Sequence, residues 1–127
     1  MYRVYDKNKK QWINDDVFLA PNDDLYINKK TIFGNDKLFL LPKHRFVYQK
    51  NILVRDRNNK YIYEGDIVET PSGKIGLIAY SDYTCSYVFL HCKESKYYLI
   101  SLDSCKDFKI IGNLFDNSKL LPELASE

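Results

Sequence analysis

A chain of 127 residues is long enough to build one hydrophobic core and too short for two ordinary domains. Its 19 basic and 17 acidic residues leave a formal net charge of +2, and no apolar run is long enough to cross a membrane. Hydrophobic residues make up 45% of the chain, which excludes general disorder. The first residues lack the apolar core of a signal peptide, so we expect a cytoplasmic protein with no membrane partner.

The composition favours strands over helices. The chain has 11 Tyr and 7 Phe but only one Met, and aromatic residues suit the pleated, half-buried surface of a sheet. Cys85, Cys92 and Cys105 are odd in number and form no CxxC pair, so we expect reduced, buried thiols rather than disulfides or a zinc site.

The N-terminal part of the chain reads as short strands between polar turns. Residues 2–6 alternate in polarity, and a turn at 7–10 joins them to residues 11–13, which predicts an opening β-hairpin. Pro42 interrupts any strand that would continue past it. Further short apolar runs follow the hairpin at 17–19, 25–27, 31–33 and 38–41.

The C-terminal part continues the series of short strands at hairpin spacing, which predicts a small barrel or sandwich. Residues 116–118 can cap a short helical turn before Pro122. The expected strands are 46–49, 52–54, 61–63, 67–69, 74–80, 87–92, 97–100 and 108–111.

These patterns predict a mainly β fold, either all-β or α+β. We expect a strand-rich N-terminal subdomain of residues 1–50 to form a layer on a small C-terminal β-barrel of residues 51–127, or both to form one continuous domain. Charge divides in a similar way: residues 1–60 carry 13 basic and 7 acidic residues, a net +6, whereas residues 61–127 carry 6 and 10, a net −4. Such a dipole is compatible with an acidic partner or with head-to-tail self-association, but the simpler interpretation, which we prefer, is that both faces are only solvated.

Two motifs carry a resemblance to a known family. The segment Tyr63–Val68 reads Tyr-Glu-Gly-Asp-Ile-Val, and the segment Ile111–Asn117 reads Ile-Gly-Asn-Leu-Phe-Asp-Asn. With the opening Tyr2–Lys7, these segments resemble the YopX family of phage and prophage proteins. The resemblance implies a compact, strand-rich phage protein from a family without an established biochemical activity. It supplies no catalytic or ligand-binding residues.

The chain departs from the family pattern at three places. Ile52–Val54 stands where the family usually has Thr-Gly-Leu, Asn58–Asn59 where it has Asn-Gly, and Ser118–Lys119 where it has Pro-Glu. Asn tolerates a positive φ, so we expect the turn at Asn58–Asn59 to form. The changes affect the backbone before Asp56 more than the fold.

Glu64 and Asp66 are the only acids whose spacing suggests catalysis. On an extended segment they would lie roughly 6–7 Å apart, close to the separation of a glycosidase pair. Gly65 between them indicates a bend instead, so we interpret Glu64, Gly65 and Asp66 as a structural corner. Gly112 and Asn113 receive the same interpretation, as residues that dock the C-terminal segment.

No catalytic residue, cofactor or metal site is expected elsewhere. His44 lies between two cations, and His91 and Cys92 would point to opposite faces of a strand. Basic residues beside aromatic ones do indicate a possible contact with nucleic acid or a partner, although a pI of about 8.3 is low for such a binder. The candidate contacts are Lys43, Arg45, Tyr48, Lys50, Arg55 and Arg57.

The leading hypothesis is therefore a non-enzymatic phage or prophage accessory protein that acts by binding itself, a host protein or a small ligand. One alternative is a nucleic-acid-binding module formed by the basic and aromatic residues of the N-terminal half. Another is a phage counter-defence protein that inhibits a host immune effector or sequesters its signal.

Overall fold

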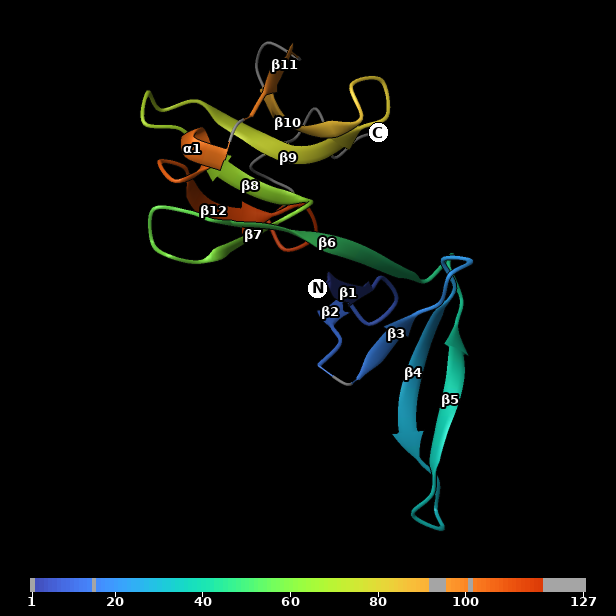
Figure 1. Ribbon diagram of the computed structural model, residues 1–127. Helices are drawn as coiled ribbons and strands as arrows, with labels where there is room; N and C mark the ends of the chain where they lie inside the picture. Colours follow the sequence, from blue (N-terminus) through green and yellow to red (C-terminus); the bar gives the residue numbers. More distant parts are fainter. Residues whose placement is uncertain (1, 15, 92–95, 101, 118–127) are drawn as a thin grey trace. The chain divides into compact units, whose positions relative to one another are not determined.

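The computed structural model describes residues 2–14, 16–91, 96–100 and 102–117. The chain separates into two compact units, which part between Gln49 and Lys50. The N-terminal unit is Tyr2–Gln49, and the C-terminal unit starts at Lys50. The described residues form twelve strands and one helix of four residues, so the predicted mainly β class is confirmed (Figure 1). No helix of this part of the chain is long and apolar enough to cross a membrane.

The opening hairpin of the N-terminal unit forms as predicted. β1 (Tyr2–Asp6) and β2 (Gln11–Trp12) pair antiparallel, with Tyr5 opposite Trp12. The ring centroids of Tyr5 and Trp12 lie 5.0 Å apart in an edge-to-face contact, a favourable arrangement of two aromatic rings. β6 (Phe46–Arg55) starts in this unit, where β1 is its neighbour, and ends in the C-terminal unit.

A separate three-stranded antiparallel sheet completes the N-terminal unit. Its order is β3 (Val17–Leu19), β4 (Leu25–Lys30) and β5 (Asp36–Leu41). β4 and β5 stay in register from Leu25 opposite Leu41 to Lys30 opposite Asp36, and they form the long ribbon in Figure 1. We call this ribbon, with its turn, the arm.

The apolar run expected at residues 31–33 is a turn, not a strand. Thr31 donates its N–H to the carbonyl of Asn35 at 2.7 Å, and Gly34 donates to the carbonyl of Thr31 at 2.9 Å. The turn that was expected at Gly34-Asn35-Asp36 therefore begins at Thr31, three residues earlier than the sequence pattern indicated.

The core of the N-terminal unit lies on one face of this sheet. Side chains of a strand alternate between the two faces, and the buried face carries Leu25, Ile27 and Leu41. These residues pack with Val4 and Phe46 in one apolar cluster.

The C-terminal unit is built on an open five-stranded sheet. Its order β11-β10-β9-β8-β12 leaves two edges, so the expected barrel is realised as a curled half-barrel. β7 (Tyr61–Tyr63) pairs with the end of β6, and α1 (Leu102–Cys105) precedes the last strand. The strands of the sheet are β8 (Asp66–Glu69), β9 (Ile75–Ser81), β10 (Ser86–His91), β11 (Lys96–Leu99) and β12 (Lys109–Asn113).

The core of this unit is dense and apolar. Ile62, Val68 and Ile78 are completely buried, and they pack with Phe89 and Phe108. A core this closely packed tolerates little loss of side-chain volume.

The cysteines meet the sequence expectation only in part. Cys105 is buried, and burial raises the pKa of its thiol to about 11. Cys85, in contrast, is exposed and not buried as predicted, because it lies on the turn between β9 and β10, where its φ is +52°. Cys92 and the helical turn expected at 119–121 lie outside the described residues.

Candidate functional site

The Glu64–Asp66 corner is the turn that joins β7 to β8. Gly65 has a φ of +90°, which an L-residue rarely adopts, and its N–H donates to the carbonyl of Ile78 at 2.7 Å. The Asp66 carboxylate is buried and accepts the N–H of Tyr63 at 2.7 Å. The Asp66 side chain thus stabilises the turn that precedes it.

The Gly112–Asn113 motif meets this corner in space. β12 pairs with β8 so that Gly112 lies opposite Ile67 and Asn113 opposite Asp66. The N–H of Leu114 donates to the carbonyl of Gly65 at 2.9 Å. The structure therefore joins two motifs that are more than forty positions apart in the sequence.

Asn113 and Gly112 shape the turn that follows β12. The Asn113 Oδ1 accepts the N–H groups of Phe115 at 3.0 Å and Asp116 at 2.9 Å. A Cβ on Gly112 would lie 2.5 Å from Oδ1 of Asn117, so only glycine fits beneath that amide. These contacts fix the backbone of the turn after β12.

The two acids of the corner have different surroundings. Burial raises the pKa of Glu64, and the nearby Lys50 ammonium opposes that rise. Burial, and then the Glu64 charge, raise the pKa of Tyr87. Neither Glu64 nor Asp66 lines either of the pockets described below. Among the residues that the structure describes, no group of three His, Cys, Asp or Glu side chains could hold a metal ion.

Two buried aspartates, which the sequence analysis did not single out, organise the turns at 6–10 and 56–60. Asp6 and Asp56 each open a turn of the pattern Asp-basic-Asn-x-Lys. In both, the carboxylate accepts the N–H two residues on, from Asn8 at 3.0 Å and from Asn58 at 2.9 Å. This repeated sequence pattern is the signal by which both aspartates could have been found from the sequence.

The two carboxylates differ in their other hydrogen-bond partners. Asp56 accepts the N–H of Ile110 at 3.0 Å and so ties its turn to β12. Asp6 instead receives two hydrogen bonds from the Arg45 guanidinium, at 3.0 and 2.9 Å. That pairing lowers the pKa of Asp6 from its ordinary 3.8 to about 2.

The six predicted contact residues are divided equally between the units. Lys43, Arg45 and Tyr48 belong to the N-terminal unit. Lys43 lies 3.5 Å from the Asp24 carboxylate, Arg45 is committed to Asp6, and the Tyr48 ring packs edge-on against Tyr2. These three residues have structural partners of their own.

The other three predicted contacts belong to the C-terminal unit. Lys50 and Arg57 are exposed. The Arg55 guanidinium lies 4.4 Å from the centre of the Tyr61 ring and donates to its hydroxyl at 3.1 Å. Within this unit, Lys50, Arg55 and Arg57 remain on the surface.

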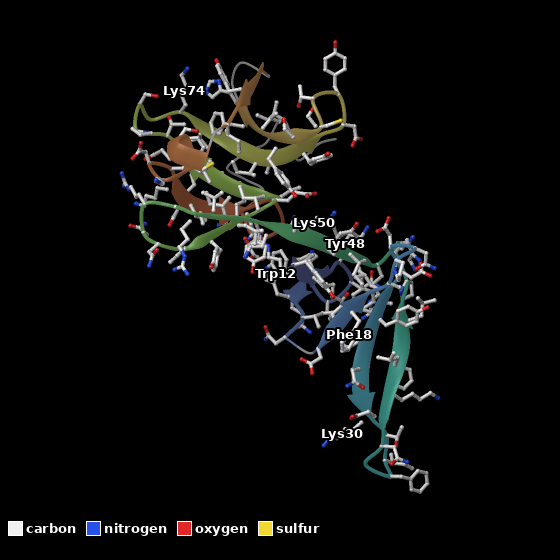
Figure 2. All side chains as sticks on the ribbon, in the orientation of Figure 1. Trp12, Phe18, Lys30, Tyr48, Lys50 and Lys74 are labelled. Carbon is white, nitrogen blue, oxygen red and sulfur yellow. The ribbon has the colours of Figure 1, made fainter. Side chains whose placement is uncertain are left out.

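The sheet β3-β4-β5 presents apolar side chains to solvent on the face away from its core. Phe18, Tyr26 and Leu40 lie side by side in register across the three strands, and Leu38 follows Leu40 on the same face. We call these four residues the outer row. Phe18, Leu38 and Leu40 are 50%, 56% and 57% exposed. Figure 2 shows Phe18 on β3.

The outer row carries charges at both ends. On β4, Asp24 comes just before the strand and Lys30 ends it near the turn of the arm. On β5 the signs are reversed, since Asp36 begins the strand and Lys43 follows its end. The turn itself exposes Ile32 by 95% and Phe33 by 83%.

A pocket of about 410 Å³ opens in the N-terminal unit. Its apolar lining includes the buried Ile27, Leu41 and Phe46 and the half-buried Trp12, which Figure 2 labels. Its charged lining consists of Lys9, Lys29 and the Asp6–Arg45 pair.

The C-terminal unit has a smaller hollow of about 230 Å³. Phe89, Tyr98 and Phe108 line it, with Lys74 at 5.0 Å from the centre of the Tyr98 ring. Lys74 is labelled in Figure 2.

Comparison with known proteins supports the fold. A family model described as YopX protein matches residues 1–122. The crystal structure of protein yopX from Bacillus subtilis is 19% identical, with a TM-score of 0.62, and that of protein EF1440 from Enterococcus faecalis is 17% identical, with a TM-score of 0.59. Each comparison covers 94% of this chain and 96% of the other. No curated protein matches the chain. At these identities, the solved structures show a shared fold alone.

Proposed function

The chain belongs to the YopX family, and from this premise we propose that it is a non-enzymatic phage or prophage protein that works by binding. We further propose that its first partner is a second copy of itself, which packs face to face on the outer row. The observation that carries the proposal is the apolar outer row on a sheet whose other face already forms the core.

The apolar content of this face supports an interface. Antiparallel sheets commonly bury one face and present polar residues to water on the other. Here Phe18, Leu38 and Leu40 stand exposed on the second face as well, beside Tyr26. Two such sheets packed face to face would remove these side chains from water, as in a β-sandwich.

The charges at the ends of the outer row favour a second copy as the occupant. In a twofold arrangement that lays β4 over β4 with reversed direction, Lys30 of one copy faces Asp24 of the other. The same operation brings Asp36 over Lys43. An isologous interface needs such self-complementarity, and the opposite order of signs on β4 and β5 provides it.

Sedimentation equilibrium over a range of protein concentrations tests this proposal. We expect a reversible dimer that salt weakens without abolishing, because the central contact is apolar and only the ends are charged. The double variant Leu38→Thr/Leu40→Thr keeps residues with high strand propensity and should weaken the dimer by at least about tenfold. Tyr83→Thr, at a 98% exposed tyrosine of the C-terminal unit, is the matched control and should leave the dimer unchanged.

A charge experiment tests the arrangement itself. Lys30→Asp alone and Asp24→Lys alone each place like charges over one another and should remain largely monomeric. Mixing the two variants should restore dimers, since every facing pair is then opposite in sign. A wild-type chain that stays monomeric at all concentrations, or a mixture no more dimeric than its components, would show that the proposal is wrong.

The arm favours a second candidate, nucleic-acid binding. It is a two-stranded ribbon with Lys29, Lys30 and Lys37 near its turn and with Ile32 and Phe33 exposed on the turn. Ribbons fit the major groove, and apolar wedges between base steps are typical of proteins that bend DNA.

A salt titration with duplex DNA tests this candidate. Lys30→Gln should weaken binding uniformly across sequences, and Ile32→Ser/Phe33→Ser should reduce bending of the DNA. Lys60→Gln, an exposed lysine of the C-terminal unit, is the control. If the wild-type chain does not bind even at low salt, this candidate is excluded.

A further inference from the structure

The pocket of the N-terminal unit has an excess of positive charge. Among the residues that the structure describes, Lys9, Lys29 and Arg45 line it with one acid, Asp6. Neither Lys9 nor Lys29 has an acidic partner among the residues that the structure describes. The pocket is therefore lined by two lysines that no described carboxylate neutralises, and such a concentration of cations attracts an anion.

Arg45 is held in place at this pocket. Its Nε and Nη2 donate to the two oxygens of Asp6, and its guanidinium carbon lies 4.9 Å from the centre of the Phe46 ring. This leaves Nη1 without a hydrogen bond to any described residue. A guanidinium fixed on one edge is ready to donate to an oxyanion from the other, at little further cost in side-chain entropy.

The pocket is also aromatic. Trp12 and Phe46 line it together with the apolar Ile27 and Leu41. Trp12 is braced by the Tyr5 ring at 5.0 Å and by the Arg3 guanidinium, 4.5 Å from its own ring centre, and it remains half-buried. A planar ring can stack on such a wall whatever its pattern of hydrogen-bonding groups.

From this combination we infer that the pocket binds a nucleotide unit, with the base against Trp12 and the phosphate between Lys9, Lys29 and Arg45. The volume of about 410 Å³ falls in the range of small-molecule pockets. This inference stands apart from the proposed dimer, because Lys29 belongs to the opposite face of β4 from the outer row.

The single Trp of the chain provides a direct readout. Titration of the full chain with AMP should quench the fluorescence of Trp12 in a saturable way, since a stacked base lies against the indole. Adenosine, which lacks the phosphate, should bind at least about tenfold more weakly, and inorganic phosphate should compete with AMP. Equal binding of adenosine and AMP, or no saturable quenching at millimolar AMP, would overturn the inference.

Two exposed lysines, Lys29 of the pocket and Lys60 of the C-terminal unit, offer a matched pair of variants. Lys29→Gln should weaken AMP binding by about tenfold, because it removes one cation from the phosphate site. Lys60→Gln changes an exposed lysine of the C-terminal unit, outside the pocket and outside the surfaces proposed above, and should bind AMP like the wild type. Far-ultraviolet circular dichroism checks that both variants fold. If both lose affinity equally, the effect is general electrostatics and the pocket assignment is wrong.

The source of the nucleotide unit is decided by a second titration. Thymidine monophosphate and a short oligo(dT) present the same group, free or within a single strand. Tighter quenching by the oligonucleotide assigns the site to a single-stranded end, whereas equal quenching per site assigns it to free nucleotides. Either result supports the inference, and absence of quenching by both contradicts it.

Discussion

The five-stranded sheet of the C-terminal unit and the three-stranded sheet β3-β4-β5 contain similar apolar side chains but bury them to different extents. In the C-terminal unit, Val68, Ile78 and Phe89 are buried in one core cluster, and their strand neighbours Ile67 and Val88 are buried as well. In the N-terminal unit, the strands β3 and β5 read as almost continuous apolar runs, so both faces are apolar while only one is buried. The comparison teaches that apolar residues on both faces of a strand can all be buried, as in β8, or mostly exposed, as in β5, so that the apolar pattern alone does not indicate whether they serve stability or contact.

The turns at Asp6 and Asp56 also differ, in the partners that their carboxylates bind. Asp56 satisfies only backbone N–H groups, from Asn58, Lys60 and Ile110. Asp6 shares its carboxylate between backbone groups and the Arg45 guanidinium, which lines the pocket. The Asp56 turn stabilises its own unit, whereas the Asp6 turn also holds the Arg45 guanidinium at the pocket.

The largest expected effect compares the two sheets directly. Ile78→Ala removes a completely buried side chain and should lower the free energy of unfolding of the C-terminal unit by about 3 kcal/mol, through lost burial and the cavity left behind. Leu40→Ala, at a 57% exposed position, should change the stability of the monomer by less than about 0.5 kcal/mol. Urea unfolding of dilute protein measures both. Equal losses would contradict the distinction between the sheets.

Removal of the Asp56 carboxylate should have the next largest effect. Asp56→Ala leaves the N–H groups of Asn58, Lys60 and Ile110 without their acceptor, at an expected cost of about 2 kcal/mol. Asp56→Asn keeps one oxygen and should cost less. Urea unfolding followed by tyrosine fluorescence provides the measurement, and a neutral Asp56→Ala would show that water replaces the carboxylate.

A smaller effect of opposite sign is expected at Leu53. This exposed leucine has a φ of +65° at the bulge of β6, at the position where the related family usually has Gly. Leu53→Gly should raise the free energy of unfolding by about 0.5–1 kcal/mol, since glycine adopts this conformation without steric cost. Leu53→Ala keeps a Cβ and should not reproduce the gain. A destabilised Leu53→Gly variant would indicate that the leucine makes contacts that offset its strain.

The smallest expected effect depends on pH. The Arg45 guanidinium holds the pKa of Asp6 at about 2 in the folded chain. The carboxylate therefore contributes its full stabilisation above about pH 4 and loses it as the pH falls through 2. Between pH 7 and pH 2.5 the melting temperature of Asp6→Asn should fall by less than that of the wild type. An equal fall in melting temperature for Asp6→Asn and the wild type would show that the ion pair contributes no stability.

The sequence alone determined the local features of this protein. Alternating polarity and turn residues predicted the opening hairpin, most later strands and the Glu64–Asp66 corner, because these depend on neighbouring residues. Asn59 has a φ of +65°, as its place in the expected turn required. The prediction of a strand at 31–33 was wrong because these residues, although apolar, form the tight turn around Gly34.

Only the tertiary structure decided which distant residues meet. Asp6 and Arg45 lie 39 positions apart, and no local pattern announces that one would be buried against the other. The junction of Gly65 with Leu114, the exposure of the outer row and the pocket beside Trp12 depend likewise on how strands pair. Turns and strands follow from short-range sterics and hydrogen bonds, whereas pockets and exposed faces follow from long-range packing, which a single sequence does not reveal.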